Sequence, residues 1–157
     1  MMVLVLAATI AGSHAAVLVT AVPGEELLQQ TFGMRIDNAG VTRWGVSYSL
    51  VQESRPIGRA IIGVFPSPNR AKKLFDDRVR HTPVPPTNAQ GSMVGNQSAE
   101  WDGRVVFIRD NVFVEVQLPG SDVGEKARAI DVALRDGIAG VKKGNEVGVP
   151  ILEDLEY

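Results

Sequence analysis

The chain has 157 residues, of which 45% are hydrophobic and 22% charged, values typical of one folded domain rather than a disordered segment. Its formal net charge of −2 supplies no overall positive field, so we expect neither nucleic acid nor an anionic membrane surface as a partner. The absence of cysteine excludes disulfides, thiolate catalysis and metal centres held by cysteine.

The N-terminal segment, residues 1–22, is apolar, and no charged residue precedes Glu25 if His14 is neutral. Residues 3–11 could form the hydrophobic region of a signal peptide, and small residues at positions 13 and 15, or 19 and 21, fit a cleavage site. We therefore predict export to the periplasm or the medium, with residues 23–157 as a single α+β domain.

Other interpretations of residues 1–22 are open, because no lysine or arginine precedes the apolar run. The segment could be an N-terminal anchor, a buried part of the fold, or the result of a mis-assigned start codon. Ser13 and His14 interrupt its middle, so we expect no stable membrane insertion of the mature domain.

The first half of the domain predicts a helix, several strands and a second helix. Residues 23–32 have a proline near the start and two glutamates in the first turn, as a short helix does. Residues 33–44 predict two short strands around a turn at Asn38–Gly40. Strands are then expected at 46–52 and 59–65, followed by an amphipathic helix beginning near Pro68.

The second half repeats this order after a proline-rich connection at 81–98. A strand around 97–101 and a turn at Asp102–Gly103 precede the segment RVVFIRDNVFVEVQ, residues 104–117. A last helix follows, with Asp122 as its N-cap. Its apolar residues recur at spacings of three and four: Val123, Ala127, Ile130, Leu134, Ile138 and Val141.

The segment 104–117 is predicted to be a hairpin that turns at Asp110–Asn111. In this register one face is wholly apolar and consists of Val105, Phe107, Val114 and Val116. The other face is polar at its base and apolar at its tip, where Ile108 lies opposite Phe113. The tip pair is either a covered cross-strand contact or an exposed patch on which a ligand or partner docks.

These elements predict an α+β fold: an antiparallel sheet with two main helices on one face. The two halves share the order strands, proline-containing loop and helix, which indicates a ββα or βββα pseudo-repeat. The alternative is that such junctions use proline and Asn or Asp in many folds.

Catalytic signals are weak, and we name no catalytic residue, metal ligand or cofactor. His81 follows a helix, and no Gly-x-Ser-x-Gly elbow accompanies it. The neighbouring carboxylates Asp76 and Asp77 diverge on a helix, which does not suit paired-carboxylate chemistry. A hydrolase built on His81 and nearby carboxylates is kept as an alternative.

The candidate binding residues are Ile108 and Phe113 at the hairpin tip, together with Trp44 and Trp101. Each tryptophan lies at a predicted strand end near a turn, where it could anchor the core or line a ligand-facing rim.

The sequence GRVVFIRDNVFVEVQLPG followed by KARAIDVAL resembles a pattern in secreted, uncharacterised prokaryotic α+β domains, a hairpin before a helix with Ala-x-x-Ile-Asp. By element order alone, the chain is also similar to small α/β/α sandwich binding proteins of the photosystem accessory type. The resemblance implies an extracytoplasmic domain and supplies no catalytic residue.

From the sequence we therefore expect an exported, non-catalytic domain that binds a partner protein or small ligand. The alternatives are the hydrolase described above and a structural or oligomer-forming domain, in which case the chain would form a homo-oligomer.

Overall fold

The computed structural model describes residues 6–8, 17–19, 25–87, 94–120 and 122–143. Their centre is a six-stranded antiparallel sheet in the order β3–β4–β5–β8–β7–β6. The strands are β3 (Arg35–Thr42), β4 (Gly45–Gln52), β5 (Arg55–Val64), β6 (Gln97–Trp101), β7 (Arg104–Arg109) and β8 (Val112–Gln117). The predicted α+β class is confirmed.

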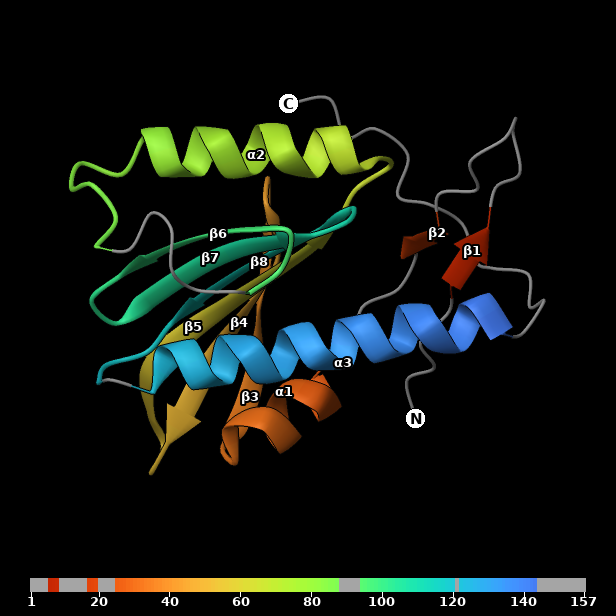
Figure 1. Cartoon of the computed structure of the whole chain (residues 1–157). Helices are drawn as coiled ribbons and strands as arrows, with labels where there is room; N and C mark the ends of the chain where they lie inside the picture. The colour runs from red at the N-terminus through yellow and green to blue at the C-terminus, as the bar shows by residue number, and fades with distance from the viewer. Residues whose placement is uncertain (1–5, 9–16, 20–24, 88–93, 121, 144–157) are drawn as a thin grey trace.

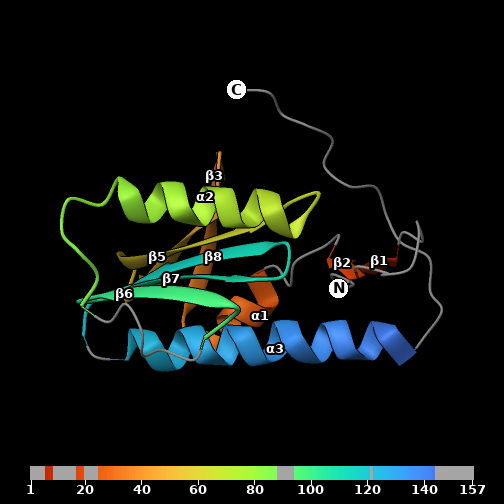
Figure 2. The same cartoon turned by 45° about the horizontal axis from the view of Figure 1, so that its top comes forward.

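The sheet lies between helices in three layers (Figure 1). One face is covered by α2 (Pro68–Arg80), and the other by α3 (Val123–Lys143) and α1 (Glu25–Phe32). Figure 2 shows the sheet between α2 and α3 from a second direction. A separate pair of short strands, β1 (Leu6–Ala8) and β2 (Val17–Val19), forms its own antiparallel ribbon.

The prediction that both main helices share one face of the sheet is wrong. Phe75 of α2 packs with Phe113, whereas Ile130 of α3 packs with Phe107 on the opposite side. The order of elements is indeed three strands and a helix, twice. If the two halves were related by a two-fold axis between β5 and β8, that axis would be perpendicular to the sheet, because these strands are antiparallel. Both helices would then lie on one face. Since α2 and α3 lie on opposite faces, the two halves share the order of their elements but not their geometry.

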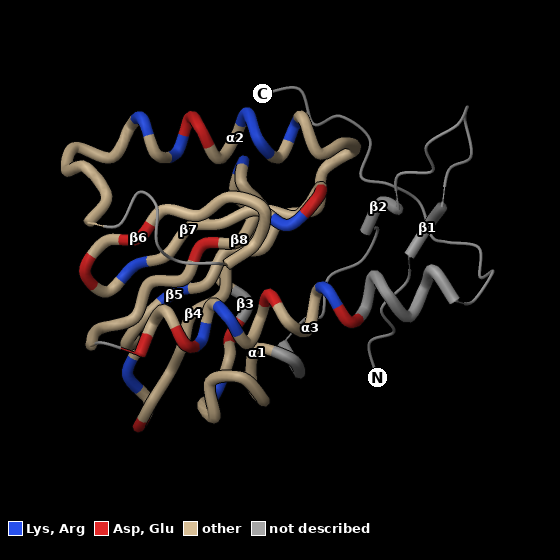
Figure 3. Tube along the Cα trace, viewed as in Figure 1, with Lys and Arg blue, Asp and Glu red and all other residues tan. Residues whose placement is uncertain are grey.

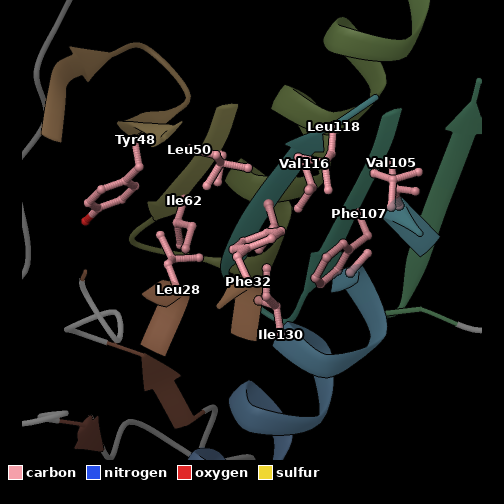
Figure 4. Packing of buried hydrophobic residues seen from close by; sticks show 14 of the residues in the cluster. Leu28, Phe32, Tyr48, Leu50, Ile62, Val105, Phe107, Val116, Leu118 and Ile130 are labelled. Atoms are coloured by element: carbon pink, nitrogen blue, oxygen red, sulfur yellow. The ribbon is translucent and has the colours of Figure 1, made fainter. Parts of the chain in front are cut away.

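The larger core lies between the sheet and the helices α1 and α3 (Figure 4). Phe107 and Ile130 are fully buried at its centre, beside Phe32 of α1. The predicted stripe of the last helix supplies Val123, Ala127, Ile130 and Leu134, all of them buried. Side chains of the stripe beyond residue 136, namely Ile138 and Val141, lie outside the described residues.

Truncation of this stripe tests the packing of α3. Replacing Ile130 or Leu134 by Ala should reduce the free energy of unfolding by about 2–5 kcal/mol, because each leaves a cavity in a closed core. Urea denaturation followed by circular dichroism measures the loss. An unchanged midpoint for both variants would mean that α3 does not pack on the sheet.

The hairpin has the predicted register. Phe107 lies opposite Val114 and Ile108 opposite Phe113, and the turn residue Asp110 has a positive φ of 51°. Such backbone geometry suits an Asp residue, whose short side chain tolerates the left-handed region. The turn at Asp102–Gly103 is also where we expected it.

The predicted turn at Asn38–Gly40 is wrong. Strand β3 runs without a break through these residues, with an irregularity in its pairing to β4 between Asn38 and Gly40. Bulges of this kind admit the glycine and bend the strand without reversing it. The chain reverses instead at Arg43–Trp44, which places Trp44 at the end of the sheet.

Most of residues 1–22 lie outside the described residues, so the signal peptide stays a prediction. Within the part of the chain that the structure describes, no helix is long and apolar enough to cross a membrane.

Candidate functional site

The hairpin tip is covered. Phe113 is fully buried and Ile108 is 4% exposed, because Ala71 and Phe75 of α2 lie over them. The start of α2 is capped by Ser67, whose hydroxyl accepts a hydrogen bond from the Arg70 N–H at 3.2 Å. Of the two interpretations of the tip pair Ile108 and Phe113, the covered cross-strand contact is confirmed and the exposed docking patch is wrong.

Trp101 is a core anchor at the end of β6. Its side chain is buried beside the same cluster, and its Nε1–H donates to the carbonyl of Val84 at 2.8 Å. The segment after α2 thus lies along β6, where the Thr87 N–H also donates to the Glu100 carbonyl at 2.8 Å. Trp101 holds this connection against the sheet.

Trp44 lies half-buried in the turn between β3 and β4. The guanidinium carbons of Arg43 and Arg78 lie 4.4 and 4.5 Å from its ring centroid, within the range of cation–π contact. Arg43 in turn pairs with Asp77 of α2 at 2.5 Å. These contacts connect Trp44 to the C-terminal part of α2.

The carboxylate of Glu115 is the centre of the most unusual arrangement in the described chain. Glu115 is 1% exposed, on the α2 side of the sheet. Arg78 of α2 donates to both its oxygens, from Nε to Oε2 at 2.7 Å and from Nη2 to Oε1 at 2.9 Å. Arg59 of β5 and Arg104 of β7 approach the same carboxylate at 3.3–3.4 Å. We call these four residues the arginine cluster.

The arginine cluster keeps Glu115 ionised. Burial raises the pKa of this carboxyl, but the hydrogen bonds from Arg78 and the charges of Arg104, Arg78 and Arg59 outweigh burial, so its pKa is below the usual value. Burial lowers the pKa of Arg104, which also stacks on Trp101 with its guanidinium carbon 4.8 Å from the ring centroid. Three guanidiniums and one carboxylate leave the cluster with two positive charges in excess.

A shallow groove opens next to the arginine cluster, where β5 and β8 separate. The two strands pair from Val64–Val112 to Arg59–Gln117, and the groove begins at this last pair. It has a volume of about 730 Å³ and is lined by Pro56, Ile57, Gly58, Arg59, Asp102, Gly103, Gln117, Leu118, Pro119 and Gly120. We call it the end groove.

A second hollow adjoins the end groove on the β6 side. It is lined by Thr87, Glu100, Trp101, Asp102, Gly103, Gly120 and Val123. Of the four predicted binding residues, Trp101 alone lines either hollow, and Trp44 lies at another place on the surface.

His81, the candidate of the hydrolase alternative, is at the C-terminal end of α2. Its side chain is 65% exposed, and its Nδ1 lies 3.1 Å from Oδ1 of Asp77. Asp76 instead pairs with Lys72, one helical turn earlier. Among the described residues, no three acidic or histidine side chains gather as metal ligands would.

A second buried ion pair fixes α3 to the sheet. Arg109 of β7 donates to both oxygens of Asp131, from Nε at 2.7 Å and from Nη2 at 2.8 Å. Burial raises the pKa of Asp131, but the hydrogen bonds from Arg109 and from the backbone of Gly95 have the opposite and larger effect, so the pKa is below its usual value. Asp131 is the last residue of the Ala-x-x-Ile-Asp sequence on which the resemblance to secreted α+β domains was based. Its role in this structure is to bind Arg109.

Sequence reasoning missed the arginine cluster, although the hairpin contained one sign of it. Arg104 and Glu115 share a face and lie on neighbouring strands as a diagonal pair, because Arg104 is two residues from Val106, which lies opposite Glu115. That pair alone indicates a surface salt bridge. The contribution of α2 leaves no local signal in the sequence, since Arg78 is 37 residues away from Glu115.

Comparisons with known proteins return nothing for this fold and site: no model of a protein family matches the chain, and no curated protein or solved structure matches it.

Proposed function

We propose that the chain is an exported, non-catalytic domain that binds a small ligand in the end groove. The observation that carries this proposal is the position of the groove, at the place where β5 and β8 part beside the arginine cluster. Ligand sites in proteins are concavities with apolar walls and a few convergent polar groups. Here Ile57 and Leu118 supply apolar surface, and Arg59 and Gln117 supply polar groups.

Export is the second part of this proposal, and it is supported by the uncharged, apolar residues 1–22. A domain that leaves the cytoplasm without cysteine needs no oxidative folding step.

A groove-filling variant tests the binding site. Pro119 is exposed and lines the end groove, so Pro119→Trp should fill it and abolish ligand binding. Pro85→Trp places the same indole at an exposed position outside both hollows and serves as the matched control. Chemical-shift changes of backbone amides, recorded while a library of small fragments is titrated into the labelled protein, provide the measurement.

We expect fragments to shift the amides of residues 57–59, 103 and 117–118 in the wild-type protein and in Pro85→Trp, but not in Pro119→Trp. Shifts that cluster elsewhere, or that persist in Pro119→Trp, would contradict the proposal.

A further inference from the structure

Three side chains form a row of hydrogen-bond donors across the sheet beside the end groove. Gln117 of β8 lies directly opposite Arg59 of β5 on one side and Arg104 of β7 on the other. All three point to the α2 side, since Glu115 and Phe113 of the same strand do so. Neighbouring side chains in such a row are about 5 Å apart, so the guanidinium of Arg59 and the amide of Gln117, which both line the groove, can reach one small group.

Glu115 does not use all the N–H donors of this row. Arg78 already contacts both oxygens of Glu115 at short distances, whereas Arg59 lies 3.4 Å from one oxygen and is 44% exposed. The buried Nε of Arg104 lies 3.3 Å from Glu115 but makes no hydrogen bond among the described residues. Because a guanidinium has five N–H donors, the exposed Arg59, which lines the end groove, retains capacity for a second acceptor.

The charge balance of the arginine cluster favours an anion as that acceptor. Glu115 neutralises one of three positive charges, and the charges that act on Arg104 are those of Glu115, Arg78 and Arg59. A second anion beside Arg59 would reduce the repulsion among the three guanidiniums around Glu115. It would also form charge-assisted hydrogen bonds, which Arg makes to carboxylate and phosphate oxygens in a two-pronged geometry.

We infer that the ligand of the end groove carries a phosphate or carboxylate group, which Arg59 binds together with the neighbouring amide of Gln117. This inference rests on the proposed function, because it names the chemistry of the ligand at the same groove. The rest of the ligand lies along Ile57 and Leu118. Asp102 lines the groove from the β6–β7 turn and repels an anion there, so the anionic group occupies the Arg59 end.

Four probes with one aromatic ring separate the possible chemistries: phenyl phosphate, benzoate, neutral benzyl alcohol and cationic benzylamine. We expect the two anions to shift the amides of residues 58, 59 and 117, and the other two probes to shift them far less. Tighter binding of phenyl phosphate identifies a phosphate ligand, and tighter binding of benzoate a carboxylate ligand; both support the inference.

Arg59→Gln tests the role of the row and retains a polar side chain of similar length. It should weaken anion binding about tenfold or more, the loss expected for a hydrogen bond to a charged group. The matched control is Arg55→Gln, the same change at an exposed position of the same strand that does not line the groove. It should leave the dissociation constant unchanged within error.

Two results would overturn the inference and leave the proposed function intact. The first is equal binding of benzyl alcohol or benzylamine in the end groove, and the second is an equal loss of anion affinity in Arg59→Gln and Arg55→Gln. If no probe or library fragment shifts the groove amides, the proposed function itself fails, and the inference fails with it.

Discussion

Replacing Glu115 by Gln should lower the free energy of unfolding by about 3–5 kcal/mol, the range for a buried ion pair that loses one partner. The neutral amide leaves Arg59, Arg78 and Arg104 around a site that is 1% exposed, with no carboxylate among them. Urea denaturation at pH 7 measures the change. Glu53→Gln, at an exposed turn position, is the control and should cost about 0.5 kcal/mol or less.

The pH dependence of the difference in unfolding free energy between the wild type and Glu115→Gln shows whether the charge of Glu115 or its packing is responsible. Because the pKa of Glu115 is lowered in the folded protein from 4.5, the carboxylate stabilises the fold fully above pH 4.5. That stabilisation decreases as the pH falls through the lower pKa of the folded state. The difference between wild type and Glu115→Gln should therefore narrow in acid. A difference that stayed constant down to acid unfolding would contradict the role of the charge.

Phe113→Ala should destabilise the protein as much as Phe107→Ala, each by about 3–5 kcal/mol. Both rings are fully buried on opposite faces of the same hairpin, Phe107 against α3 and Phe113 against α2. Val132→Ala is a control on the exposed side of α3 and should change stability by about 0.5 kcal/mol or less.

Differential scanning calorimetry and urea denaturation of the three variants measure these effects. A loss for Phe113→Ala that matches the Val132→Ala control would show that α2 does not cover the hairpin tip. It would restore the docking patch that the sequence suggested at Ile108 and Phe113.

Elements with local signals were predicted well. The pairing of Phe107 with Val114 follows from the alternation of apolar residues and one turn, which together leave a single register. The last helix follows from its periodic apolar stripe. In both cases the information lies within about 20 residues, in agreement with the local origin of the patterns.

The side of the sheet on which α2 packs was not predictable in this way. Strands β7 and β8 are apolar on both faces near the tip, so their pattern accepts a helix on either face. The chain between β5 and α2 is bonded to the hairpin turn. There the Asn111 amide donates to the Phe65 carbonyl at 2.8 Å, and the Phe65 N–H donates to the Asn111 carbonyl at 2.9 Å.

The candidate site depends on contacts between residues that are far apart in the sequence. Glu115 lies on the hairpin face that was predicted to be polar at its base, and no local pattern indicated that it is buried. Its burial results from Arg78 and Arg59, which are 37 and 56 residues away. The end groove is similarly formed by segments near residues 57, 103 and 118, and no local pattern joins them.

The placement of α2 makes the two halves of the chain dependent on each other. This helix follows the strands of the first half, but its apolar side chains Ala71 and Phe75 pack on β7 and β8 of the second half. A fragment ending before β6 would expose the inner side of α2 to water, and a fragment beginning at β6 would expose Phe113. The similar halves therefore form one cooperative folding unit, and two separate fragments would acquire structure only when mixed.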